Sequence, residues 1–432
     1  MIKFSKISIL IKVSVGGSLL LSSAVFAPCV LAQDGQDSLF SRDRNISVTQ
    51  RERPEYQSEG VRRGAFVFRP LVNLQTLYSD NIFANNDDRV DDLIVRLNPS
   101  IDVLSDWSRH ELRGHADLDH NQFIDNSNEN TTSFTLGVNS RYDASSRIDF
   151  RSGAEFSRGF ERRSVAGAAF ASQDPIQFDD VSFNLGTRYE SGRARIGIEG
   201  SLRDINYEDG VDALDQEIDQ DFRDFQNLGV RARTEYALSP TTAVFVQGEY
   251  SDVSHDDLPL SGITRDRQNI SGRVGADFEV SNLIRGQVGV GFFNSQFSSD
   301  VFNDVDGLSF DGRVEWFATP LITVTGYGHQ GIRPSELLVS PATTEFQLGL
   351  QVDYEYRRNI IFSAGYEHTV DDYSFIDRDD QRDTAYFSGI ILFNPNIGIQ
   401  GRVSHQSLDS EGLLSQPNFD ETRVSFGVVL RR

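Results

Sequence analysis

Apolar and polar residues alternate with a period of two along most of the chain after residue 65. In the segment 134–142, one face of an extended strand carries apolar side chains and the other carries polar ones. Phe134, Leu136, Val138 and Tyr142 oppose Thr135, Gly137, Asn139 and Arg141. An α-helix has a period of 3.6 residues and would mix the two sets. The pattern therefore predicts an all-β chain.

Short turn signals recur along this pattern, and each pair of neighbouring turns encloses two strand segments and a longer acidic stretch. The turns are Ser105–Arg109, Asp143–Arg147, Glu190–Arg193, Ser239–Thr242, Ser281–Leu283, Ala318–Pro320, Arg357–Asn359 and Asn394–Asn396. Eight short turns separate nine hairpins, which predicts 18 strands between about Ala65 and Leu430. An even strand number with short turns on one rim and long loops on the other is typical of outer-membrane barrels.

Aromatic residues precede seven of the eight turns, on the apolar face. They are Tyr142, Tyr189, Tyr236, Phe278, Trp316, Tyr356 and Phe393. Such a row is typical of the aromatic belt at a membrane interface. We therefore predict a transmembrane antiparallel up-and-down β-barrel. Its short turns, its belt and both termini would be on the periplasmic side, and its long acidic loops would be extracellular. A β-sandwich, which would bury the apolar face against a second sheet, is the structural alternative.

The polar face of an 18-stranded barrel is expected to line a lumen wide enough for water. We predict that these charged residues line it: Arg113, Arg151, Arg195, Arg231, Arg233, Arg273, Arg313, Glu155, Glu199, Glu235, Asp311 and Glu315. Cross-strand pairing of arginine with carboxylate would stiffen the wall. The opposed charges would also create a transverse field that a neutral, hydroxylated solute tolerates.

Residues 1–32 have the features of a secretory signal peptide: three early lysines and an apolar run from Val13 to Phe26. We expect cleavage near Ala32, with Ala27 as the other candidate site. The only cysteine, Cys29, precedes Ala32, so disulfides would not stabilise the mature chain. After Ala32, no run of 18 apolar residues predicts a transmembrane helix.

Residues 33–64 form a polar segment before the barrel, which we assign to residues 65–432. The segment is predicted to be periplasmic. Three interpretations stay open for it: a disordered leader, a docking element for a periplasmic partner, or a partial plug of the pore.

A formal charge of −23 argues against nucleic acid as a partner, because a phosphate backbone would be repelled. Aspartates concentrate in the predicted long loops, among them Asp87, Asp88, Asp91 and Asp92 in the first, residues 204–224 in the fourth, and Asp371, Asp372, Asp377, Asp379, Asp380 and Asp383 in the eighth. Solvated, repelling loops explain this charge, and divalent cations bridging to lipopolysaccharide are the functional alternative. The segment 300–307 resembles a calcium loop, but its ligand spacing is incomplete, and we predict no metal site.

Motifs of catalysis are absent from the sequence: there is no His-Glu-x-x-His, no phosphate-binding glycine loop and no Gly-x-Ser-x-Gly. His110, His115 and His120 are spaced by five residues, so His115 would face away from the other two in a strand. We therefore expect no enzyme activity, no catalytic residues and no cofactor.

The region from Gly60 to Arg113 resembles the start of the putative β-barrel porin 2 family of Gram-negative outer-membrane proteins. The resemblance is in Gly64–Pro70, Tyr78–Phe83, Leu97–Ser100 and the turn Ser105–His110. It implies an outer-membrane passage for exopolysaccharide or capsule export, by passive translocation. The partners would be outer-membrane lipid and lipopolysaccharide, a polysaccharide and a periplasmic export protein. The alternatives are a diffusion porin for small hydrophilic solutes and a closed structural or adhesion barrel.

Overall fold

The computed structural model describes residues 46–165, 172–212, 214–255, 262–281 and 283–432. The predicted signal peptide and its cleavage site lie outside the described residues. Within those residues, no helix is long and apolar enough to cross a membrane.

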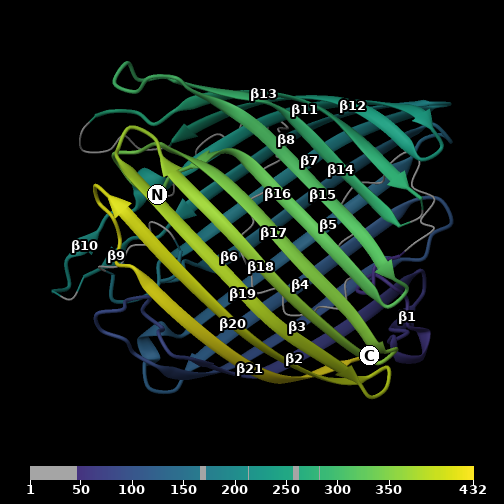
Figure 1. The fold of residues 1–432 in the computed structure, drawn as a ribbon, viewed down its shortest axis with the longest axis horizontal. Coiled ribbons are helices and arrows are strands. Elements are labelled where there is room, and N and C mark those ends of the chain that lie inside the picture. Colours follow the sequence, from purple (N-terminus) through teal and green to yellow (C-terminus); the bar gives the residue numbers. More distant parts are fainter. Residues whose placement is uncertain (1–45, 166–171, 213, 256–261, 282) are drawn as a thin grey trace, which may run out of the picture.

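Eighteen long antiparallel strands of the described chain form one closed sheet (Figure 1). They are β2 (Phe66–Ser79), β3 (Asp92–Ser105), β4 (Glu111–Phe123), β5 (Thr131–Asp143), β6 (Ile148–Phe160), β7 (Gln177–Ser191), β8 (Ala194–Tyr207), β11 (Phe225–Ser239), β12 (Thr242–His255), β13 (Arg267–Val280), β14 (Ile284–Phe297), β15 (Val305–Thr319), β16 (Ile322–Pro334), β17 (Ala342–Arg357), β18 (Ile360–Tyr373), β19 (Arg378–Leu392), β20 (Ile397–Gly412) and β21 (Phe419–Arg431). The predicted fold class and strand number are confirmed.

Small elements decorate the two ends of the barrel. Strand β1 (Val61–Arg63) pairs with the start of β2, and β9 (Gly210–Val211) pairs with β10 (Glu217–Ile218) in one long loop. Three single-turn 3-10 helices complete the described elements: η1 (Pro54–Tyr56), η2 (Ser127–Glu129) and η3 (Asp221–Arg223).

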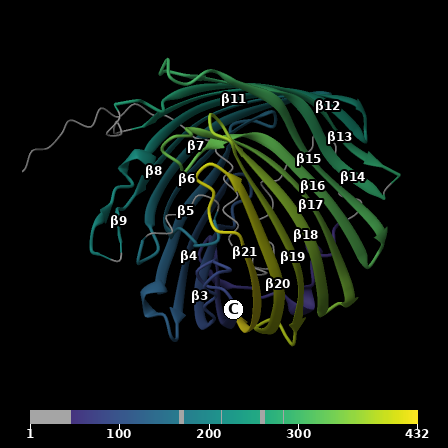
Figure 2. The same cartoon turned by 60° about the vertical axis from the view of Figure 1, so that its left-hand side comes forward.

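Strands β2 and β21 close the barrel. Their register runs from Leu71 opposite Arg431 to Ser79 opposite Arg423. Figure 2 shows the early strands on one side of the barrel and the late strands on the other. The backbone N–H of Arg432 adds a hydrogen bond of 3.1 Å to the carbonyl of Pro70. Closure matters because an open edge would present unpaired backbone groups, which a lipid environment cannot satisfy.

The connections have the predicted asymmetry. Eight short turns join β3–β4, β5–β6, β7–β8, β11–β12, β13–β14, β15–β16, β17–β18 and β19–β20 at one end, which we call the short-turn mouth. The other connections lie at the opposite end, the long-loop mouth. Each predicted turn lies within two residues of the observed one.

The two faces of the sheet differ as the alternation predicts. Leu136 and Val138 are 51% and 43% exposed on the outer face, whereas Gly137 and Asn139 lie on the inner face. Large apolar side chains on the outer face are accessible around the barrel instead of packing against a second sheet, so the β-sandwich alternative is wrong.

One predicted loop is much shorter than expected. Strand β18 extends to Tyr373 and β19 begins at Arg378, so most of the aspartates assigned to the eighth loop belong to strands. Asp371 and Asp380 are opposite each other in the ladder, and both are buried on the inner face. Arginines bind these two carboxylates, at 3.2 Å from Arg333 to Asp371 and 2.6 Å from Arg378 to Asp380, which allows the acidic segments to pair as strands.

Glycines on the inner face allow close packing of neighbouring strands. An alanine at position 291 would place its Cβ against the backbone carbonyl of Gly272, which cannot move away as a side chain could. At Gly197, also on the inner face, a Cβ would meet only the Thr187 carbonyl, at 4.0 Å.

We expect Gly291→Ala to lower the free energy of unfolding by about 1–3 kcal/mol, the usual cost of overpacking. Gly197→Ala, the matched control, should stay close to the original protein. The measurement is the denaturant concentration at the midpoint of unfolding in detergent. Unfolding is monitored by the difference in gel mobility between the folded and the unfolded barrel. Equal midpoints for both variants would contradict the packing argument.

Candidate functional site: the lumen and its two mouths

A network of ion pairs covers part of the lumen wall from β8 to β13. The guanidinium of Arg233 donates to Glu235 at 2.6 Å and to Asp277 at 3.1 Å. Arg195 lies 3.5 Å from the other oxygen of Glu235. These contacts connect the side chains of three strands, β8, β11 and β13.

Further predicted lumen residues belong to two other clusters of ion pairs, one on β11–β13 and one on β14–β15. A carboxylate oxygen of Glu249 forms ion pairs with guanidinium nitrogens of Arg231, at 3.6 Å, and Arg273, at 3.8 Å. The carboxylate of Glu315 forms ion pairs with Arg285 and with Arg313, the latter at 3.4 Å.

The remaining predicted lumen residues also lie on the inner face. Their pairs are Arg113–Glu111 at 3.6 Å, Arg151–Asp149 at 3.0 Å, Glu155–His115 at 3.4 Å and Asp311–His329 at 3.6 Å, while Glu199 is opposite Arg231 in the ladder. Among the predicted residues that form ion pairs, Arg313 and Glu155 have the most exposed side chains, at 57% and 48%. The structure thus places the predicted residues on the inner face of strands between β4 and β15. Their contact with a moving solute stays a prediction.

The predicted belt residues lie on the outer face beside the short turns. Tyr142, Tyr189, Tyr236, Trp316, Tyr356 and Phe393 are exposed, and Phe278 is half-buried. His110 stacks on Tyr142 with ring centroids 4.5 Å apart. His110 and His120 face away from His115, which forms its ion pair inside the lumen.

The short-turn mouth contains a segment that precedes the barrel in sequence. We call residues 46–58 the N-terminal strap. Val48 is fully buried against inner-face residues at the rim, and its N–H donates to Thr323 Oγ1 at 3.1 Å. The apolar cluster comprises Val48, Ile361, Ile390 and Leu392, with Tyr56 packed against it. This apolar patch interrupts the polar inner face, and the strap covers it.

Two arginines of the strap converge on one carboxylate of β17. Arg51 and Arg53 donate to the same oxygen of Glu355, at 3.0 and 2.9 Å. Arg53 also donates to the carbonyl of Val48 at 2.6 Å, which folds the strap onto itself. Burial lowers the pKa of Arg53, and the charge of Glu355 opposes that shift.

The strap extends along the inner wall from β14 to β21. Arg285 donates to the side chain of Gln50 at 2.8 Å, and Arg431 donates to the carbonyl of Tyr56 at 2.7 Å. Among the three interpretations of residues 33–64, this is the geometry that partial plugging requires, for residues 46–58. The sequence contains one signal of the apolar patch that the strap covers: the apolar run at 390–393 breaks the alternation of apolar and polar residues.

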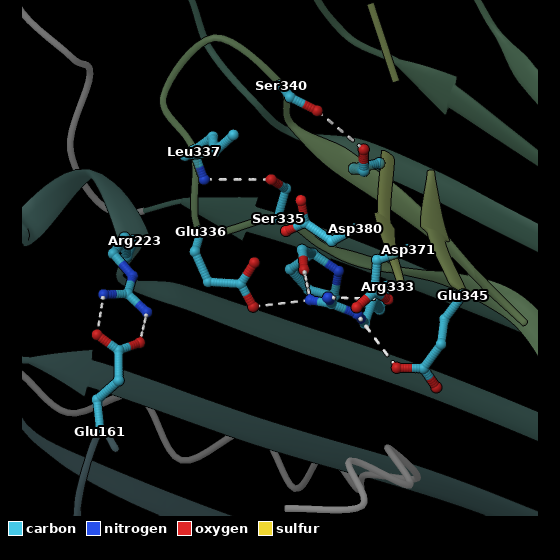
Figure 3. Close-up of polar contacts among 12 residues, drawn as sticks. Glu161, Arg223, Arg333, Ser335, Glu336, Leu337, Ser340, Glu345, Asp371 and Asp380 are labelled. Carbon is cyan, nitrogen blue, oxygen red and sulfur yellow. Dashed lines mark hydrogen bonds and ion pairs between the residues drawn. The ribbon is translucent and has the colours of Figure 1, made fainter. Parts of the chain in front are cut away.

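At the long-loop mouth, charged residues of several loops contact one another (Figure 3). Arg223 of η3 donates to both oxygens of Glu161, at 2.6 and 3.3 Å, and so links the β8–β11 loop to the β6–β7 loop. Burial acts to lower the pKa of Arg223, but the charge and hydrogen bonds of Glu161, with Tyr207 and Glu336, together hold the pKa above its usual value.

Loops β12–β13 and β16–β17 join the same cluster. Arg265 donates to the carbonyls of Phe222 and Ser335, and Arg267 donates to that of Pro341 at 2.7 Å. In Figure 3, Arg333 lies among three carboxylates, Glu336 at 2.7 Å, Asp371 at 3.2 Å and Glu345 at 3.4 Å. Sequence reasoning missed this cluster, because its partners lie on different strand ends and loops and nothing in the local pattern marks them.

Three carboxylates meet in the β8–β11 loop. Oxygens of Asp209, Asp219 and Asp221 lie within 4.8 Å of one another, and all three residues are exposed. Asp209 accepts from the N–H of Gln220 at 2.7 Å, and Asp219 from that of Asp221 at 3.0 Å, so part of this spacing arises from turn formation.

The sequence pattern of the family described as "Putative beta-barrel porin 2" matches residues 53–432. The chain belongs to this family. No curated protein matches it. Solved structures with a similar barrel include the outer membrane protein opdK from Pseudomonas aeruginosa, at 12% identity and a TM-score of 0.47, covering 84% of this chain and 99% of that one.

Two further structures illustrate the range of similar barrels. A BenF-like porin from Pseudomonas fluorescens Pf-5 has 10% identity and a TM-score of 0.45, covering 84% of this chain and 99% of that one. The siderophore receptor PirA from Acinetobacter baumannii has 6% identity and a TM-score of 0.46, covering 84% and 80%. Family and fold together make this chain a porin-like barrel of the Gram-negative outer membrane.

We expect Val48→Asp to release the strap, because a carboxylate cannot stay buried unpaired in the apolar patch. The conductance of single refolded channels should then rise. Ile46→Asp is the matched control, since Ile46 is 41% exposed on the same segment. If both variants keep the original conductance, the strap does not restrict the mouth.

Proposed function

We propose that this barrel is a passive channel for small hydrophilic solutes, with its short turns and both termini on the periplasmic side. The observation that carries the proposal is that buried contacts hold chain segments at both mouths, where these segments would narrow the passage. The strap is fixed by Val48 and Glu355, and the loops by Arg223 and Arg333. A passage narrowed in this way favours small solutes over wide polymers.

The wall offers a moving solute many exchangeable hydrogen bonds. Pairs such as Arg313–Glu315 and His115–Glu155 each include a partly open side chain. Solvated ion pairs contribute only about 0–1 kcal/mol each, so a hydroxylated solute can compete for their donors and acceptors. Transport would follow the concentration gradient of the solute.

Export of an exopolysaccharide, which the family resemblance implies, is the second candidate. Tyr327 and Tyr386 favour it, because each ring lies over a glycine of an adjacent strand on the inner wall, Gly349 and Gly365. Their hydroxyls donate to Glu367 at 2.8 Å and to Gln351 at 3.0 Å. Aromatic rings beside carboxylate and amide groups suit the apolar and hydroxylated faces of a sugar.

Swelling of liposomes that contain the refolded protein tests the first candidate. Neutral sugars of increasing size are supplied outside, and empty liposomes serve as the control. We expect rapid swelling with monosaccharides and a steep fall as the oligosaccharide lengthens, because the narrowed mouths exclude the larger solutes. Absence of swelling with every sugar would contradict the proposal.

Polysaccharide measured outside and inside a deletion strain, with the gene restored in trans as the control, separates the two candidates. Retained polymer inside the cell with loss outside would favour export. Unchanged polymer with slower uptake of small solutes would leave the small-solute channel.

A further inference from the structure

Residues 161–165, at the start of the β6–β7 connection, reach the inner face of the barrel at β20. The side chain of Gln406 in β20 donates to the carbonyl of Ser164 at 3.3 Å, across 242 residues of sequence. In the closed sheet, strands β21, β2, β3, β4 and β5 lie between β20 and β6. The start of this loop therefore extends across the interior instead of folding outward.

Arg163 anchors the loop on one side. Its guanidinium donates to Glu129 at 2.7 Å and to the carbonyls of Ser172 and Gln173 at 2.8 and 2.9 Å. The Arg163 side chain is 8% exposed, so it serves structure. The side chain of the preceding residue, Arg162, is exposed and forms neither a hydrogen bond nor an ion pair within the part of the chain that the structure describes, while its backbone carbonyl accepts from the N–H of Val165 at 3.1 Å.

The charges that act on Arg162 are unevenly balanced. The two strongest are the guanidiniums of Arg423 and Arg96, followed by the carboxylates of Asp119 and Glu421. Both carboxylates are already engaged, Asp119 by Arg96 and Glu421 by Arg423 at 2.5 Å. The charge of Arg162 is therefore in excess at this point of the lumen.

Arg162 keeps its charge in this position. Its side chain is open to lumen water, but the surrounding barrel displaces bulk solvent, and this desolvation together with Arg423 and Arg96 lowers the pKa of Arg162 to about 10. At neutral pH the guanidinium is protonated.

Arg402 adds a second cation on the same wall. Its guanidinium lies 4.0 Å from the ring centroid of Tyr386, and no carboxylate pairs with it among the described residues. Arg402 is two residues from Ser404, which is opposite Arg423 in the ladder between β20 and β21. Arg402 and Arg423 therefore share one region of the inner face.

We propose that Arg162 binds the carboxylate group of small solutes, with the paired Arg96 and Arg423 strengthening the local positive field and Arg402 adding a further cation on the same inner face. A planar guanidinium fork matches a carboxylate and binds it through two hydrogen bonds. The acidic outer loops do not prevent this, because solvated charges are screened beyond about 8–10 Å at physiological salt. This inference deepens the proposed channel function and rests on it.

The test uses the refolded full chain in planar bilayers. Glucuronate is the carboxylate probe and glucose its neutral counterpart, each added to a potassium chloride solution. Arg162→Gln should weaken the block of current by glucuronate about five- to tenfold, the loss expected for one charge-assisted contact. It should also reduce the preference for chloride over potassium in a salt gradient. Arg193→Gln removes the same charge from the β7–β8 turn and should change neither quantity.

The variant Arg162→Lys separates the contribution of the planar guanidinium from that of the positive charge, because lysine keeps only the charge. We expect it to keep the chloride preference and still lose part of the glucuronate block. Equal block of the original protein and Arg162→Gln would overturn the inference. Stronger block by inorganic phosphate than by glucuronate would overturn the assignment to carboxylates.

A direct binding measurement makes failure of the inference distinguishable from failure of the channel function. Glucuronate binding to the detergent-solubilised protein is followed by equilibrium dialysis, which needs no open pore. Binding that Arg162→Gln abolishes, in a protein that carries no current, would keep the site and overturn the channel. Current without Arg162-dependent binding would keep the channel and overturn the site.

Discussion

Pairing between arginine and carboxylate inside the lumen is the interaction on which the rest of this structure depends. A period of two sends half of every strand's side chains inward, and in this chain many of them are charged. Isolated charges in a narrow interior would be costly, because part of their hydration is lost. Networks such as Arg195–Glu235–Arg233–Asp277 offset part of that cost and connect strands through their side chains as well as their backbones.

The same interaction shapes both mouths. At the short-turn mouth, Glu355 forms ion pairs with two arginines of the strap. At the long-loop mouth, Glu161 pairs with Arg223, and Asp371 pairs with Arg333. In the proposed channel, the size of the passage would therefore depend on the segments that the barrel wall binds as well as on the number of strands. Arg162 is an informative exception, because its neighbours' carboxylates are taken by other arginines.

The strands and turns could be predicted from sequence because their signals are local. Alternation, turn residues and the aromatic positions before each turn all lie within a few residues of one another, and together they predicted the observed strand number. The prediction of a long eighth loop was wrong for a related reason. Clustered aspartates usually indicate a solvated loop, and the arginines that stabilise Asp371 and Asp380 within strands are recognisable only in the folded barrel.

The contents of the lumen could be predicted only in part. Inward positions follow from the period, so the charged wall residues could be named in advance. The strap could not be assigned, because Val48 meets its apolar partners about 310 residues or more further along the chain. Nor could Arg162 be told from Arg163, since the difference between them is Glu129, which only the fold brings near Arg163.

Single-channel recording from the refolded full-length protein tests most directly the central claim that bound segments narrow an otherwise wide lumen. The account predicts stable, small conductance steps, well below those of an unobstructed barrel with the same number of strands. Steps of the unobstructed size, recorded with the strap and the loops intact, would contradict it.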